Sequence, residues 1–354
     1  MLLLALLLAL PALALERPGT VFPVFQFPAD KIPRIDGKTD DWAMVPPSYV
    51  IGTDQLAETV KGRGRKYDSK DLDVRVRVGW VKGLNRLYFL YEAEDNYWDF
   101  ARRDLHNDIF EVVVDGDLSG GPLIGPMHPN KQLNQWDAFF SYHGVHAQNY
   151  HIFTPALDKD WAMAWGCQPW IKELPWANAA YDYNFKPGES GKLVLEFWIT
   201  PFDYAGCDGP ERAIESKLWE NKIIGLSWSV LDYDDVNAST YTGFWNLSHK
   251  TTMYGDASDL VAFKLMPLEA NLRKAVEAQW SFRVLDETRR LVAFQDLSGG
   301  DIARWKWDFG DGTSSSERHP LHAYQKDGHY VVTLEVEGPK GKARRSKVWD
   351  VTLR

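Results

Sequence analysis

Helical periodicity, cysteine and catalytic motifs are all scarce in this 354-residue chain. Its apolar residues occur in short runs rich in Val, Tyr, Phe and Trp, separated by clusters of Gly, Pro, Asn and Asp, a pattern typical of antiparallel β-sandwiches. The chain lacks a nucleophile elbow, a zincin helix motif and a phosphate-binding loop, so it points to no common class of hydrolase or nucleotide enzyme. We predict an all-β protein.

Positive charge is also in short supply, because the net charge is −9. Nucleic acids and anionic membranes require a basic face, so neither is an expected partner. Aromatic residues make up 14% of the chain and include 16 tryptophans. This composition suits a neutral ligand that stacks on rings.

Long apolar runs are confined to residues 1–15, which end in the small-x-small pattern Ala12-Leu13-Ala14. This segment is too short to span a membrane and is typical of a secretory signal peptide, although a basic residue near its start is missing. We therefore expect a secreted or periplasmic protein without a transmembrane segment.

The two cysteines are Cys167 and Cys207. Export would permit a disulfide between them. Spacing does not reveal whether their Cα atoms come close enough, so two options stay open, a bridge or two unpaired core thiols.

The strand pattern and a change in composition predict two domains. Residues 30–267 should form a large antiparallel sandwich with a long insertion at about 116–191. Between residues 268 and 279 the chain becomes rich in Glu, Ala, Lys and Leu, which suggests a short helical or extended linker. Residues 280–354 should form a second β-domain.

This second domain contains the run Trp305-Lys306-Trp307-Asp308-Phe309-Gly310-Asp311-Gly312. It resembles a polycystic kidney disease (PKD) domain, an immunoglobulin-like β-sandwich, over its whole length. Alternation places Trp305, Trp307 and Phe309 on one face, and the glycines allow the positive φ of a tight turn. The resemblance implies a spacer or a module that contacts protein or polymer.

The first domain resembles a family 9 carbohydrate-binding module over about Pro33 to Pro267. The resemblance rests on the order of five motifs, which are Ile35 to Trp42, Tyr91 to Asp95, Asn107 to Asp115, Val194 to Pro201 and Ser227 to Asp234. It implies a large antiparallel β-sandwich. A related sandwich holds haem in some redox subunits, so the fold does not fix the function.

The resemblance also implies a sugar site in which two tryptophans sandwich a ring and polar groups bind its hydroxyls. This chain has Leu105 and Tyr254 at the tryptophan positions and keeps the acidic strand residue as Glu111. An arginine of the following strand is absent where Asp137 to Phe140 stands. Our candidates for stacking are Trp98, Trp245 and Tyr254, and those for hydrogen bonding are Asn107 and Glu111. Burial or loop anchoring is the alternative for each aromatic residue.

The insertion is unusually aromatic for a loop region, with tryptophans at 136, 161, 165, 170 and 176. Long loops usually carry function or are disordered, and this one is too aromatic for disorder. It forms either a lid over the sugar site or a satellite core.

Two acidic clusters are candidate calcium sites. Asp115 and Asp117 begin a loop of alternating oxygen ligands, but the closing position of an EF-hand falls on Pro126. Asp232 and Asp234 form the second cluster. Ordinary Asp-rich turns are the alternative for both, and we expect one structural calcium in the domain.

Three functional hypotheses follow. The preferred one is a secreted, non-catalytic protein that binds a polysaccharide or oligosaccharide and is accessory to carbohydrate catabolism. The second is a glycoside hydrolase with its site in the insertion, since carboxylates are plentiful. The third is a haem-binding electron-transfer domain. His143, His146 and His151 are grouped, but we expect them to be surface or packing residues because His143 and His146 would face opposite sides of a strand.

Overall fold

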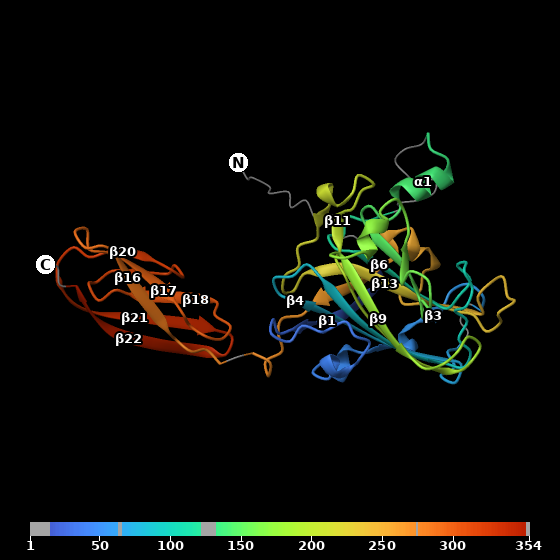
Figure 1. Ribbon diagram of the computed structural model, residues 1–354, viewed down its shortest axis with the longest axis horizontal. Helices are drawn as coiled ribbons and strands as arrows, with labels where there is room; N and C mark the ends of the chain where they lie inside the picture. Colours follow the sequence, from blue (N-terminus) through green and yellow to red (C-terminus); the bar gives the residue numbers. More distant parts are fainter. Residues whose placement is uncertain (1–14, 63–65, 122–131, 274, 352–354) are drawn as a thin grey trace, which may run out of the picture. The chain divides into compact units, whose positions relative to one another are not determined.

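The computed structural model describes residues 15–62, 66–121, 132–273 and 275–351, and it divides the chain into two compact units, Met1–Pro267 and Leu268–Arg354 (Figure 1). The predicted signal peptide therefore lies almost entirely outside the described residues. The predicted all-β class is confirmed, with one α-helix, α1 (Gln135–Tyr142), in the first unit. No helix in the described segments is long and apolar enough to cross a bilayer.

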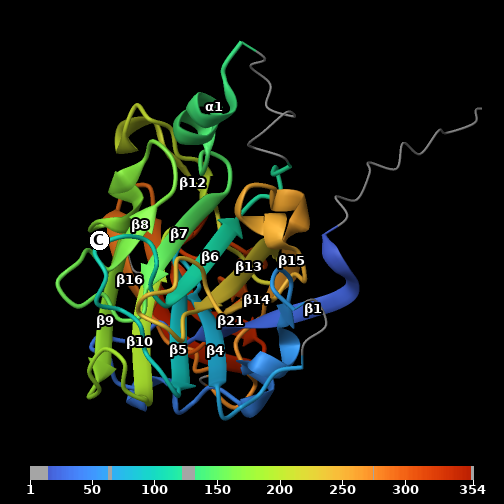
Figure 2. The ribbon, with the colours of Figure 1, turned by 90° about the vertical axis from the view of Figure 1, so that its right-hand side faces the viewer.

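The first unit is one curled sheet whose two halves face each other. One half has the order β8-β7-β6-β13-β15 and the other the order β4-β5-β10-β9 (Figure 2). Phe110 of β6 lies 6.2 Å from Phe197 of β10, ring to ring, across the core. The strands are β4 (Leu72–Val81), β5 (Leu87–Asp95), β6 (Ile109–Asp115), β7 (Gln148–Phe153), β8 (Ala162–Ala164), β9 (Ala177–Tyr183), β10 (Gly191–Ile199), β13 (Ile223–Asp232), β14 (Gly243–Asn246) and β15 (Val261–Leu265).

Strand β1 (Glu16–Phe27) joins the two halves. Its first part pairs with β15, with Phe22 opposite Phe263, and its last part pairs with β4, with Gln26 opposite Trp80. Both pairings are parallel, so β1 is an exception in the predicted antiparallel sandwich. The predicted domain start at residue 30 also leaves out β1. Pro18, Gly19 and Pro23 interrupt the alternation of apolar and polar residues by which other strands are recognised.

A buried carboxylate fixes the motif Ile35 to Trp42. Glu196 of β10 accepts hydrogen bonds from the backbone N–H of Gly37 at 2.8 Å and from the Trp42 indole at 2.8 Å. It also accepts from the backbone N–H groups of Asp36 and Lys38. Gly37 has φ +79°, and a Cβ there would lie 2.8 Å from the backbone of Tyr181. The motif therefore holds the first loop against the sheet.

The aromatic insertion is mostly part of the fold and not a loop. It supplies β7 and β8 at one edge of the sheet and β9 at the other edge. Trp161, Trp170 and Trp176 pack against the main core, while Trp136 is 67% exposed. A disulfide between Cys167 and Cys207 closes a 40-residue separation, so the bridge is the option that the structure adopts.

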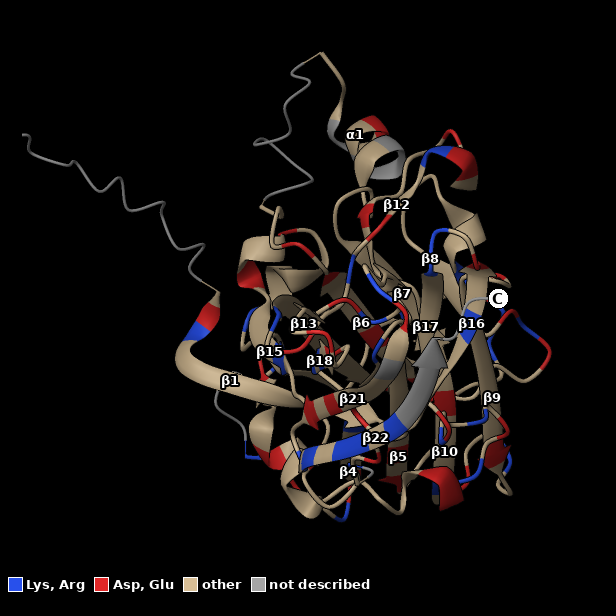
Figure 3. Ribbon diagram, turned by 90° about the vertical axis from the view of Figure 1, so that its left-hand side faces the viewer, with Lys and Arg blue, Asp and Glu red and all other residues tan. Residues whose placement is uncertain are grey.

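The second unit is a two-sheet sandwich around Trp280 and Trp307, which are both fully buried. Phe309 is also buried, and Trp305 is half-buried with its indole N–H donated to Asp296 at 2.9 Å. Lys and Arg residues follow one another along the edge strand β22 (Figure 3), as expected for an edge protected against further pairing. Its strands are β16 (Trp280–Asp286), β17 (Leu291–Asp296), β18 (Arg304–Asp308), β19 (Ser314–Ser315), β20 (Leu321–Ala323), β21 (Gly328–Gly338) and β22 (Gly341–Val351).

Replacing Glu196 by Gln should lower the free energy of unfolding of the first unit by about 1.5–3 kcal/mol, because hydrogen bonds to a charged acceptor are lost. Chemical denaturation followed by tryptophan fluorescence measures this. Glu94→Gln, at a half-exposed position of neighbouring β5, is the matched control and should change stability by no more than about 0.5 kcal/mol. Equal effects of the two substitutions would contradict the structural role of Glu196.

Candidate functional site

Four polar side chains lie in register across neighbouring strands on the outer face of the first half-sheet. His151 pairs with Glu111, Glu111 with Ser229, and Ser229 with Asn246. We call these four residues the polar row. Each is at most 6% exposed. Buried polar groups are costly unless they find partners, so a row of four requires a specific explanation.

Two small apolar clusters flank the polar row on the same face. One is built around Ile109 and Leu231, and the other around Val113 and Met253. They follow from strand alternation, because Ile109, Glu111 and Val113 point to the same side of β6. The polar row is therefore a hydrophilic strip that lies between the two apolar clusters.

Asn149 connects the row to the loops above it. Its Nδ2 atom donates to Glu111 Oε1 at 3.1 Å and to the carbonyl oxygen of Tyr254 at 3.1 Å, and lies 3.4 Å from His143 Nε2. Its Oδ1 atom is buried and accepts no hydrogen bond from the described residues. A buried acceptor of this kind is costly in a closed site and useful in one that binds a ligand.

Burial sets the charge of the site. It raises the pKa of Glu111 to about 7, against the opposing hydrogen bonds from Asn149 and Trp165. Burial also lowers the pKa of His143 and of His151 to about 4. Both imidazoles are therefore neutral at neutral pH while Glu111 changes charge there. The site can both donate and accept hydrogen bonds and carries at most one negative charge.

The two positions where the family resemblance implies tryptophans lie beside this group. The backbone of Leu105 lies beside His151, whose two buried ring nitrogens make no hydrogen bond to the described residues, and the backbone of Tyr254 bonds to His143. Leu105 is 38% and Tyr254 36% exposed, so both side chains reach the surface. The structure thus brings together Glu111, Tyr254 and Leu105.

The predicted roles of Trp98 and Trp245 are wrong. Trp98 is 1% exposed, stacks on Phe185 with ring centres 4.9 Å apart, and donates its indole N–H to the carbonyl of Gly191. Trp245 is 3% exposed and packs edge-on against Tyr67. Neither ring has a free face for a sugar.

The predicted ligand contact of Asn107 is also wrong, because both polar atoms of this buried side chain have partners within the protein. Its Nδ2 atom donates to the carbonyl of Asp104 at 2.7 Å, and its Oδ1 atom lies 3.4 Å from the ammonium of Lys159. Asn107 fixes the loop that presents Leu105.

Sequence reasoning did not place Asn149, His151 or Trp165 beside Glu111. It placed the strand after β6 at Asp137 to Phe140, but those residues belong to α1 and the next strand is β7. His143 and His151 are close to Trp165, with ring centres 6.3 and 5.8 Å away. The alternation of polar Asn149 and His151 with apolar Tyr150 and Ile152 was the signal that could have located β7.

A second cluster on this unit is acidic. Carboxylate oxygens of Asp95, Asp108 and Asp232 lie within 4.8 Å of one another, as do those of Asp71, Asp232 and Asp234. Burial, with neighbouring carboxylates, raises the pKa of Asp95 to about 7 and holds the pKa of Asp108 well above its usual range. An all-carboxylate set of hard oxygen ligands fits calcium. Asp232 and Asp234, which the sequence predicts as metal ligands, thus lie beside carboxylates of Asp71, Asp95 and Asp108 that the sequence did not indicate.

Asp115 and Asp117 differ from this cluster. The carboxylate of Asp115 accepts the backbone N–H groups of Asp117, Leu118 and Gly120. Neither residue joins a group of three potential ligands in the part of the chain that the structure describes. In the described residues this loop is a hydrogen-bonded Asp turn, and its role as a metal loop stays a prediction.

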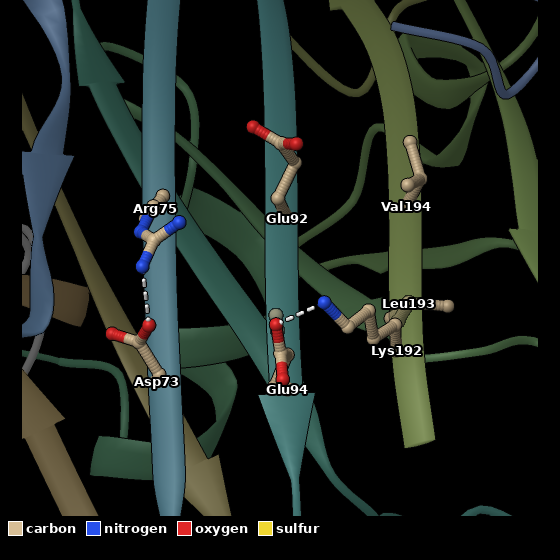
Figure 4. A pocket seen from close by; sticks show the side chains of 8 residues that line it. Asp73, Arg75, Glu92, Glu94, Lys192, Leu193 and Val194 are labelled. Atoms are coloured by element: carbon tan, nitrogen blue, oxygen red, sulfur yellow. Dashed lines mark hydrogen bonds and ion pairs between the residues drawn. The ribbon is translucent and has the colours of Figure 1, made fainter. Parts of the chain in front are cut away.

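A separate hollow of about 120 Å³ crosses β4, β5 and β10 (Figure 4). Asp73 pairs with Arg75, and Glu94 with Lys192, across its lining. Such exposed ion pairs contribute little and offer no ring for stacking, so this hollow is a weaker candidate than the polar row.

Residues 277–353 match the family model described as the PKD domain. The C-terminal unit is a PKD domain. Collagenase ColQ1 of Bacillus cereus is 46% identical over 48 residues, which are 14% of this chain and 5% of the collagenase. Pre-pro-metalloprotease PrtV of Vibrio cholerae is 48% identical over 44 residues, 12% of this chain and 5% of that protein. The match thus spans about a twentieth of these relatives.

Solved structures are similar to each unit. The PKD1 domain of the Vibrio cholerae metalloprotease PrtV is 31% identical, covers 22% of this chain and 96% of its own, and has a TM-score of 0.20. A family 9 carbohydrate-binding module from Caldicellulosiruptor kristjanssonii in complex with glucose is 14% identical. It covers 72% of this chain and 99% of its own, with a TM-score of 0.44.

The acidic cluster predicts a pH dependence of stability. The folded pKa of Asp95 lies above its unfolded value, so its stabilising contribution is complete at low pH and is lost as the pH rises toward and through 7. With a chelator present, the free energy of unfolding of Asp95→Asn relative to that of wild type should be higher at pH 8 than at pH 5 by at least about 1 kcal/mol. Denaturant unfolding at both pH values measures the difference, and exposed Asp158→Asn is the control. A constant difference for Asp95→Asn would contradict the assignment.

Proposed function

We propose that the first unit binds a polysaccharide or oligosaccharide at the polar row without breaking a bond. The observation that carries the proposal is a buried, partly unsatisfied polar strip beside a half-exposed aromatic ring. In this proposal the protein is exported and accessory to carbohydrate catabolism. Its PKD domain acts as a spacer or as a contact to another protein or polymer.

The chemistry of the row suits sugar hydroxyls, which both donate and accept. Glu111 accepts a hydroxyl hydrogen, and the unpaired Oδ1 of Asn149 accepts a second one. The ring of Tyr254 can pack on the C–H face of a pyranose. Leu105 replaces the second aromatic ring by a smaller apolar contact, so we expect weaker binding than a two-tryptophan clamp gives.

Two alternatives have less support. A glycoside hydrolase requires a pair of carboxyl groups roughly 5–9.5 Å apart. The side-chain hydrogen-bond partners of Glu111 are Asn149 and Trp165, and neither is a carboxylate. For a haem domain, His143 and His151 would be the axial candidates, but both are buried, and His143 already contacts Asn149 and the backbone of Tyr254.

We also propose that the cluster of Asp95, Asp108 and Asp232 holds a structural calcium ion. Loss of like-charge repulsion would stabilise the unit, and mass action makes the gain depend on free calcium. After chelation, added calcium should raise the midpoint of thermal unfolding by several degrees, and Asp232→Asn should abolish the increase. Asp117→Asn should retain it. An unchanged midpoint with calcium, or an equal increase in both variants, would contradict the site.

The sugar site is tested by titrating the protein with a panel of soluble oligosaccharides, calcium present, and following tryptophan fluorescence or heat. Glu111→Gln should weaken binding by about tenfold, which is the loss of a charge-assisted hydrogen bond. Affinity should rise from pH 6 to pH 8 as Glu111 ionises, and Glu111→Gln should remove this trend.

Two substitutions of Tyr254 separate stacking from folding. Tyr254→Phe keeps the ring and should retain binding, whereas Tyr254→Ala should weaken it. A panel without binding, or unchanged affinity in Glu111→Gln, would overturn the proposal.

A further inference from the structure

A second hollow lies on other elements of the first unit. Its volume is about 340 Å³, within the range of small-molecule sites. It forms where the turn between β4 and β5 meets the segment before β9, the end of β10 and the short strand β12 (Ile214–Glu215). Its lining includes the side chains of Asn85, Arg86, Trp176 and Glu215. The polar row lies on β6, β7, β13 and β14, so the two sites have no strand in common.

Arg86 gives this hollow a positive group without a carboxylate partner. The guanidinium carbon lies 3.9 Å from the ring centre of Trp198, so one face of the group is occupied. The hydroxyl of Tyr88 is a further hydrogen-bonding partner. Among the described residues, no carboxylate lies within ion-pair distance of Arg86. A guanidinium held by a ring presents its edge N–H groups, which match a carboxylate in bidentate geometry.

The opposite polar wall is fixed by an amide. Asn85 Nδ2 donates to Glu215 Oε2 at 2.8 Å, and Asn85 Oδ1 accepts the backbone N–H of Leu218. Glu215 is half-buried and is held by this bond on one oxygen. Amide and carboxylate side chains in fixed positions are suited to sugar hydroxyls.

Trp176 supplies the aromatic wall. Its ring packs edge-on against Phe202 and Trp170, at 5.6 and 5.9 Å between ring centres, which holds it rigidly. The residue is half-buried and also lines the hollow. An aromatic ring, an amide, a carboxylate and a guanidinium without a carboxylate partner thus line one concave surface.

We propose that this hollow binds an acidic pyranose, a uronic acid unit of an oligosaccharide or polysaccharide. Its carboxylate pairs with Arg86, its C–H face packs on Trp176, and its hydroxyls bond to Asn85 and Glu215. This second site takes a different class of sugar from the polar row and does not depend on the function proposed there.

The test is a titration of the full chain with glucuronic acid and, in parallel, with glucose at the same ionic strength. Wild type should bind glucuronate at least tenfold more tightly than glucose at this site, and added salt should weaken the binding. Arg86→Gln and Trp176→Ala should each weaken glucuronate binding by at least tenfold, with Arg86→Lys between Arg86→Gln and wild type.

Two control variants distinguish loss of binding in this hollow from misfolding and from loss of binding at the polar row. Trp219→Ala removes a tryptophan that is 55% exposed and outside the lining, and should leave glucuronate binding unchanged. Glu111→Gln should also leave glucuronate binding unchanged, although it weakens binding at the polar row. Circular dichroism confirms that each variant is folded. Absent glucuronate binding, or equal binding of glucose and glucuronate, would overturn the inference, as would binding that is unaffected in folded Arg86→Gln.

Discussion

Strand β6 is buried on both faces, and this constraint determines the character of the site. Its inward residues Phe110, Val112 and Val114 form the core between the half-sheets. Its outward residues would normally meet water, but two apolar clusters cover both ends of that face. Glu111 therefore sits between them in a low-dielectric setting, where a carboxylate needs partners. The polar row, the raised pKa and the unsatisfied amide oxygen all follow from this position.

Four buried acidic groups of the first unit show how partners decide the role of a carboxylate. Glu196 accepts four N–H groups and acts as a structural anchor, while Asp115 accepts three and closes a turn. Asp108 lies among other carboxylates, a setting that favours a cation. Glu111 has one amide and one indole partner and thus keeps capacity for a ligand.

Much of the fold could be predicted from the sequence because alternation and apolar runs mark β4, β5, β6, β10 and β13. Strand β1 could not, because its prolines and glycine interrupt the alternation. Strand β7 was missed because the aromatic residues of α1 resemble a strand in composition. The closure of the Cys167–Cys207 bridge depended on a Cα separation, 5.0 Å, that spacing does not reveal.

The site was predictable only in part. Glu111 stood out as an acid inside an apolar strand, and Tyr254 through its place in the order of motifs. Trp98 and Trp245 were assigned wrongly because composition cannot tell a stacking ring from a core ring when tryptophan is abundant. Asn149 and His151 depend on the register between β6 and β7, which no local pattern of residues specifies.

The most direct test of the central claim is a nuclear magnetic resonance titration of the protein with the soluble oligosaccharide that binds most tightly in the panel. The claim is that the polar row is the floor of a sugar site. It predicts that the side-chain amide of Asn149 and the indole of Trp165 shift together and saturate at one ligand concentration, while the indole of buried Trp98 stays unchanged. Saturable shifts confined to other faces of the unit, with Asn149 unmoved, would contradict it.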